Sequence, residues 1–194
     1  MAKIFCVANQ KGGVGKTTTT VNLAAGLAKI GQRVLMVDLD PQGNATMGSG
    51  VDKRELKHTI YDVLLESASI KDARVKSIKL EEYGCAYDVI GSNRELAGAE
   101  VELVDEERRE ARLKAALAVV AEEYDFVLID CPPSLSMLTL NGLCCAHGVI
   151  VPMQCEYFAL EGLTDLVNTI KQVHANLNRE LKIIGLLRVM FDPR

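Results

Sequence analysis

The sequence contains no apolar run long enough to cross a membrane, and its six cysteines include no C-x-x-C pair. The first absence argues against a membrane-spanning helix, and the second argues against a redox dithiol or a cysteine-held metal cluster. Because no secretory leader opens the sequence, we expect reduced thiols and a cytoplasmic protein. Positive charge is not in excess, since the formal net charge is −4. Bulk electrostatics therefore give no sign of nucleic-acid binding, although they permit a local basic patch.

The composition is that of an ordinary globular protein, with 48% hydrophobic and 25% charged residues. No repeat, low-complexity tract or linker divides the 194 residues, so we expect a single domain over 1–194. Predicted strands alternate with predicted helices, which indicates a doubly wound α/β fold with a mainly parallel sheet. We expect strands over 4–8, 32–38, 87–91, 124–130, 148–152 and 181–190, and helices over 19–30, 59–66, 96–123 (one or two), 136–146 and 160–177.

A glycine-rich stretch between the first predicted strand and the first predicted helix has the sequence context of a phosphate-binding loop. Glycines let backbone N–H groups gather round a phosphate chain, and the helix N-terminus adds partial positive charge. Lys16 is placed to reach the β- and γ-phosphates, and the Thr17 hydroxyl to bind magnesium. A turn that merely joins strand to helix is the alternative. The predicted nucleotide-binding residues of this loop are Lys11, Gly12, Gly13, Val14, Gly15, Lys16, Thr17 and Thr18.

The loop departs from the general pattern at Gln10, where a glycine is usual five residues before Gly15. It has a second lysine, Lys11, in the order Lys-Gly-Gly-x-Gly-Lys-Thr. This form resembles the deviant Walker A loop of P-loop NTPases of the ParA/MinD superfamily of dimerising ATPases. The resemblance implies ATP and Mg²⁺ as cofactors, and a Lys11 that crosses a dimer interface to touch the partner's ATP. A solvated loop lysine is the alternative.

Two carboxylates follow the second predicted strand, at the sheet edge where ligands bind in open α/β folds. Proline and glycine make the segment after Asp38 a loop that is free to respond to a γ-phosphate. Asp40 is the candidate for orienting or deprotonating the attacking water. Asp38 is expected to be a structural or metal-linked carboxylate. A turn or cap residue is the alternative for either aspartate.

The apolar run 124–130 ends in Asp130, which matches the Walker B arrangement, where a carboxylate holds magnesium directly or through water. Asp130 and Thr17 are therefore the predicted metal-site residues. The pattern is weak alone, because turns also begin with aspartate, but it gains weight beside a phosphate loop. Pro132, Pro133 and Ser134 match the second switch segment of the ParA/MinD superfamily.

Further segments resemble the ParA/Soj chromosome- and plasmid-partitioning branch, namely 8–10, 38–46 and 154–162. In the last of these, the resemblance places Glu156 near Lys11 at the nucleotide edge and dimer interface. A solvated loop carboxylate is the alternative for Glu156. The resemblance implies a slow ATPase that forms a homodimer when ATP-bound, binds DNA non-specifically and associates with the nucleoid. It also implies a ParB-like partner that stimulates hydrolysis, and no membrane.

Family members usually continue past the last predicted strand with elements that contact adenine and DNA. We therefore expect this chain to lack the family's C-terminal part, which leaves an exposed sheet edge.

Three other functions share the fold. A MinD-like localisation or assembly ATPase would act at a membrane or protein partner, but no terminal basic amphipathic helix is present. A metal-cluster carrier or reductase would need paired cysteines. An amidating or ligase enzyme of the cobyrinic-acid-synthase group is supported by the nucleotide loop alone. The partitioning ATPase is the preferred interpretation.

Overall fold

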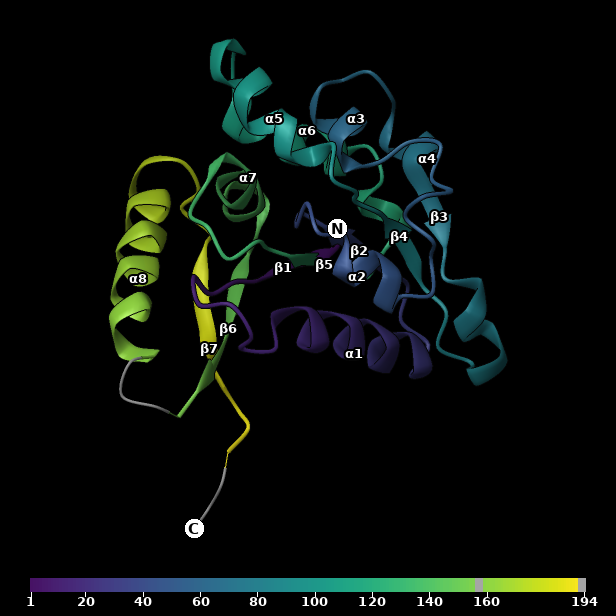
Figure 1. The fold of residues 1–194 in the computed structure, drawn as a ribbon, viewed down its shortest axis with the longest axis horizontal. Helices are drawn as coiled ribbons and strands as arrows, with labels where there is room; N and C mark the ends of the chain where they lie inside the picture. Colours follow the sequence, from purple (N-terminus) through teal and green to yellow (C-terminus); the bar gives the residue numbers. More distant parts are fainter. Residues whose placement is uncertain (156–158, 192–194) are drawn as a thin grey trace.

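The computed structural model describes residues 1–155 and 159–191, and Figure 1 shows their arrangement. No described helix is long and apolar enough to cross a membrane. The strands are β1 (Lys3–Val7), β2 (Val34–Asp38), β3 (Arg74–Lys76), β4 (Asp88–Ile90), β5 (Phe126–Asp130), β6 (Gly148–Gln154) and β7 (Lys182–Val189). The α-helices are α1 (Lys16–Lys29), α2 (Asn44–Gly48), α3 (Ile60–Leu64), α4 (Ile70–Ala73), α5 (Leu96–Glu102), α6 (Arg112–Ala118), α7 (Met137–Cys145) and α8 (Ala159–Asn176). Short 3₁₀ segments are η1 (Ile78–Tyr83), η2 (Leu103–Asp105), η3 (Arg109–Ala111) and η4 (Ala121–Glu123).

The seven strands form one sheet in the order β3-β4-β2-β5-β1-β6-β7. Every neighbouring pair is parallel except β3 with β4. The register places Val7 opposite Asp130, and Asp130 opposite Asp38. The carboxyl ends of β1, β5 and β2 therefore lie side by side, where ligands bind in open α/β sheets. The predicted doubly wound, mainly parallel fold is confirmed.

Helices cover both faces of the sheet, as Figure 1 shows for α1 on one side and α7 on the other. Buried side chains of α3 to α8 pack with one face in a large core cluster, and those of α1 and α2 with the other face in a smaller one. In β5, Val127 and Ile129 join the large cluster, whereas Leu128 joins the small one. The strand is apolar on both faces because both are covered.

The predicted helical stretch 96–123 is broken into α5 and α6, which 3₁₀ turns separate. Arg108, between η2 and η3, has φ +52°, a left-handed backbone that a continuous right-handed helix cannot contain. The charged run 106–110 lies between α5 and α6, outside both α-helices. Arg112, at the start of α6, pairs with Glu106 and Glu66 at 2.6 Å each.

β7 forms one edge of the sheet, and its apolar side chains are only partly covered. Ile184 and Leu186 are 58% and 51% exposed. The expected exposed edge is therefore present in the described part of the chain.

Candidate nucleotide-binding site

The loop between β1 and α1 has the backbone of a phosphate cradle. Gly13 (φ +72°) and Gly15 (φ +79°) adopt left-handed conformations that favour glycine. A Cβ added at Gly12 or Gly13 would meet no atom within 4 Å, so the loop faces open space. Helix α1 begins at Lys16, and no side chain of the described residues caps it. Its first N–H groups are thus available to an anion, which fits the phosphates of a nucleotide.

Lys16 is buried and turns its ammonium back over this loop. Its Nζ atom donates a hydrogen bond to the Lys11 carbonyl at 3.1 Å. Burial lowers the pKa of Lys16, while the nearby Asp130 and Asp40 carboxylates act in the opposite direction. The ammonium therefore sits where added negative charge would be stabilised strongly. Val14, also predicted as a binding residue, has a buried side chain, so only its backbone can face a phosphate.

The two predicted metal-site residues are in direct contact. The Thr17 hydroxyl donates to Asp130 Oδ2 at 2.7 Å, and Thr20 donates to Asp130 Oδ1 at 3.1 Å. Burial and the neighbouring Asp38 charge raise the pKa of Asp130 to about 7. A hydroxyl and a carboxylate are hard oxygen ligands that suit Mg²⁺, whose charge would favour the ionised carboxylate. The sequence analysis missed Thr20, which lies one helical turn after Thr17 and so on the same face of α1.

No group of three or more His, Cys, Asp or Glu side chains among the described residues could hold a metal ion. A divalent cation would therefore rely on Thr17, Asp130, water and the phosphates, as Mg²⁺ usually does.

The two aspartates after β2 occupy different environments. Asp38 is fully buried and accepts hydrogen bonds from Thr46 N (2.8 Å), Thr46 Oγ1 (2.7 Å) and Asp40 N (3.1 Å). Burial raises the pKa of Asp38 to about 6. Asp40 is half-buried, and its Oδ1 accepts from Gln42 N at 2.9 Å. Of the two roles expected for Asp38, the geometry fits the structural one.

Asp40 meets the phosphate loop in one open crevice of about 330 Å³. Its lining combines glycines of the loop, polar and charged side chains, and the second proline of the 131–136 loop. The lining residues are Gly12, Gly13, Gly15, Lys16, Thr17, Thr18, Asp40, Asn44, Pro133 and Met190. The structure thus brings together most of the residues that the sequence predicted for the site.

Lys11 lies on the β6 side of the loop. Its backbone N–H donates to Asn9 Oδ1 at 3.0 Å, and its Nζ atom donates to Gln154 Oε1 at 3.4 Å. Asn9 in turn donates to the Pro152 carbonyl at 2.7 Å, which ties the loop to β6. Glu156 lies outside the described residues, so its predicted place beside Lys11 stays a prediction.

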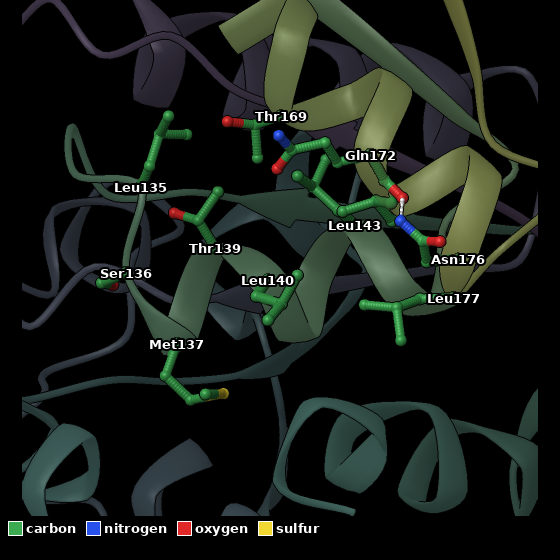
Figure 2. Close-up of a pocket in the computed structure, with 11 residues that line it drawn as sticks. Leu135, Ser136, Met137, Thr139, Leu140, Leu143, Thr169, Gln172, Asn176 and Leu177 are labelled. Atoms are coloured by element: carbon green, nitrogen blue, oxygen red, sulfur yellow. Dashed lines mark hydrogen bonds between the residues drawn. The ribbon is translucent and has the colours of Figure 1, made fainter. Parts of the chain in front are cut away.

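A larger groove of about 550 Å³ lies between α7 and α8, and Figure 2 shows its lining. The lining side chains are apolar or uncharged, among them Leu135, Leu143, Thr169 and Gln172. Ser136, at the start of α7, has a buried Oγ atom with no hydrogen-bond partner among the described residues. Without charge or a titratable group, this groove cannot do phosphate chemistry, and the smaller crevice remains the candidate site.

Comparison with known proteins gives a consistent result. A family model described as "AAA domain" matches residues 2–183. The sporulation initiation inhibitor protein Soj of Bacillus subtilis is 52% identical over 194 residues, which cover all of this chain and 75% of Soj. The chromosome partitioning protein ParA of Caulobacter vibrioides (strain NA1000 / CB15N) is 48% identical, over 99% of this chain and 71% of that protein.

Solved structures share the fold and contain bound nucleotides, although their described functions differ. A Mycobacterium smegmatis protein described as cobyrinic acid a,c-diamide synthase, with bound ADP and magnesium, has a TM-score of 0.94 at 44% identity. The match covers all of this chain and 77% of that one. A putative plasmid partition protein of Borrelia burgdorferi bound to AMPPNP has a TM-score of 0.82 at 30% identity, over all of this chain and 76% of that one. The chain belongs to the ParA/Soj family of P-loop ATPases, which use ATP and Mg²⁺.

Proposed function

We propose that this chain is a switch ATPase for chromosome or plasmid partitioning, which dimerises on ATP and acts with DNA and a ParB-like partner. One observation carries the proposal: Lys16, Thr17 and Asp40 line one crevice at the carboxyl edge of the sheet, and Asp130 contacts Thr17. The partitioning role is supported by the names of the relatives, Soj and ParA, at about half identical residues.

Each residue has a separate task in this proposal. Backbone N–H groups of 12–18 and the Lys16 ammonium hold the phosphates and offset their charge. Thr17 and Asp130 hold Mg²⁺, which supplies further charge neutralisation at the transferring phosphate. The Asp40 carboxylate positions the attacking water and receives or orients its proton. Since phosphoryl transfer depends on positioning and electrostatics, turnover is slow until a partner completes the arrangement.

In this proposal, dimerisation makes DNA binding depend on the bound nucleotide. Lys11 reaches the ATP of the second protomer. Glu156 pairs with Lys11 at the dimer interface. The ATP-bound dimer binds DNA non-specifically and thereby associates with the nucleoid, and hydrolysis releases it. Lys11 supports this role by its position, because it lies at the β6 side of the loop, against Gln154, and not in the lining of the crevice.

An ATP-dependent amidating enzyme is the second candidate, favoured by the similarity to the protein described as cobyrinic acid a,c-diamide synthase. It requires the same nucleotide site but also a carboxylate substrate and an ammonia donor. ATP turnover that depends on cobyrinic acid and glutamine would favour it, and turnover that depends on DNA and a ParB-like protein would favour partitioning.

The test is phosphate release by the purified chain with Mg²⁺ and ATP, with and without DNA and a ParB-like protein. We expect weak Mg²⁺-dependent turnover that rises when both are added, and DNA binding that weakens steeply with salt. Turnover that neither DNA nor the ParB-like protein changes would contradict the partitioning proposal.

A further inference from the structure

Ser92 packs against the loop that contains Asp40. It follows β4, the strand that pairs with β2 in the sheet. The Ser92 side chain is fully buried. The carboxyl ends of β2 and β4 are adjacent, so a residue just after β4 can reach the loop that leaves β2.

A closed set of hydrogen bonds joins Ser92 to the Asp40 backbone. Ser92 Oγ donates to the Asp40 carbonyl at 2.8 Å, and Ser92 N donates to Thr46 Oγ1 at 2.9 Å. Thr46 Oγ1 donates to Asp38 Oδ2 at 2.7 Å, and Asp38 Oδ1 accepts from Asp40 N at 3.1 Å. Both polar groups of the Asp40 backbone are thus held. Asp38 accepts from the N–H, and the carbonyl accepts from Ser92 Oγ and, within the loop itself, from Gly43 N at 2.9 Å. Ser92 is therefore the contact that ties this carbonyl to a different segment of the chain.

The loop is also packed closely against Ser92. A Cβ added at Gly43, where φ is +63°, would stand 2.5 Å from the Ser92 carbonyl oxygen. A Cβ at the neighbouring Gly91 would stand 2.9 Å from Thr46 Cγ2. These distances leave no room for any side chain between the two segments, so a shift of Ser92 would be transmitted to the loop.

The Asp40 side chain has little support of its own. Among the described residues its carboxylate is bonded only to the Gln42 N–H two residues further on, within the same loop. The position of the carboxylate over the crevice therefore depends on how its backbone is held. A general base must lie within hydrogen-bond reach of the water it activates, and small displacements reduce rates strongly.

We propose that Ser92 is a positioning residue for ATP hydrolysis, which fixes Asp40 over the nucleotide crevice through the Asp40 carbonyl. This inference rests on the proposed role of Asp40. It predicts that Ser92 affects the chemical step and leaves nucleotide binding intact, because Ser92 does not line the crevice.

The test compares Ser92→Ala with Ser49→Ala. Ser49 is equally buried, and its Oγ atom bonds the Ala45 carbonyl at 2.7 Å and Tyr87 Oη at 2.8 Å, with no bond to Asp40. Ser92 Oγ also lies 3.4 Å from the Asn93 carbonyl, so both variants lose a buried hydroxyl with two polar contacts. A general loss of stability should therefore affect both. Ser92→Cys, which keeps the size of the side chain and a weak donor, serves if the alanine variant fails to fold.

We expect Ser92→Ala to lower kcat about 10- to 100-fold with KM for ATP nearly unchanged, and Ser49→Ala to leave both nearly unchanged. Amide hydrogen exchange in 40–43, the turn that contains the Asp40 carbonyl and has no bond to Ser49, should quicken in Ser92→Ala alone. Ser92→Cys should lie between the wild type and Ser92→Ala.

Equal kcat values for Ser92→Ala and Ser49→Ala would overturn the inference, as would wild-type kcat in Ser92→Cys. Asp40→Ala separates the two proposals. If it abolishes turnover while Ser92→Ala behaves as Ser49→Ala, only the role of Ser92 fails. If Asp40→Ala keeps full turnover, the proposed catalytic role of Asp40 fails first.

Discussion

The nucleotide crevice has two sides that are built differently. The binding side, residues 12–18 with Asp130, is fixed by strand register and by the first turn of α1. The responsive side, residues 38–46, leaves the sheet after one last backbone bond, from Leu39 N to the Asp130 carbonyl at 2.9 Å. Beyond it, the loop is held by hydrogen bonds that involve the side chains of Asp38, Thr46 and Ser92. Changing the strand register would require unpacking the core, whereas a few hydrogen bonds of a loop can be replaced by others at a small cost in free energy. We therefore expect the first side to bind nucleotide and the second to respond to it.

Removing the Asp40 carboxylate should separate the two sides most clearly. In Asp40→Ala we expect turnover to fall about 100- to 10,000-fold, because the water loses its base or orienting group, while ATP still binds. The protein should then accumulate as an ATP-bound dimer. Asp52→Ala is the control, since that half-buried carboxylate pairs with Arg54 at 2.7 Å outside the crevice. Single-turnover kinetics measure the hydrolysis rate, and calorimetry measures ATP binding. Loss of ATP binding in Asp40→Ala would contradict the assignment of binding and hydrolysis to different sides of the crevice.

Lys16→Ala tests the binding side. We expect ATP affinity to fall about 10- to 100-fold, because a charge-assisted hydrogen bond to the phosphates is lost. Lys29→Ala, at the exposed far end of the same helix, should bind normally. Calorimetric titration with ATP and Mg²⁺ measures the change. Normal affinity in Lys16→Ala would mean that the nucleotide binds elsewhere.

The buried Asp38 should make the stability of the metal-free protein depend on pH. Its pKa rises from 3.8 when exposed to about 6 in the folded state. Between these values the folded state holds a proton that the unfolded state has released. The free energy of unfolding should therefore fall by about 3 kcal/mol as pH rises from about 4 to about 6, and level off above.

Urea unfolding of Asp38→Asn beside the wild type tests this effect. The variant removes the titration of Asp38 and also the charge that helps to raise the pKa of Asp130, and both changes act in the same direction. The variant should show the smaller decline over that range. Parallel pH profiles for the two proteins would contradict the assignment of the shift to Asp38.

The smallest expected effect on the binding side concerns Thr20. In Thr20→Val the Asp130 Oδ1 atom loses its 3.1 Å partner with little change of shape, and we expect a loss of about 1 kcal/mol in unfolding free energy. Thr19→Val, on the same helix and outside this contact, is the matched variant. Chemical denaturation compares them, and equal stability would remove Thr20 from the site.

The binding side could be predicted from sequence because its signals are local. The apolar runs of β1, β2 and β5 and the glycines before Lys16 act within a few residues, and a parallel sheet aligns their ends. On the responsive side, the loop after Asp38 and the candidate role of Asp40 could also be predicted. The contact with Ser92 could not, because Ser92 meets Asp40 only after β4 pairs with β2, at a separation of 52 residues. The single domain over 1–194, and the roles of Lys11 and Glu156, stay predictions.

The most direct test is light scattering of the wild type and Lys11→Ala with Mg²⁺ and either ATP or ADP. We expect the wild type to double its mass with ATP and remain a monomer with ADP. Lys11→Ala should bind ATP yet stay a monomer, because it lacks the group that reaches the second nucleotide. A wild type that binds ATP but never dimerises, or a Lys11→Ala variant that dimerises as the wild type does, would contradict the proposed switch.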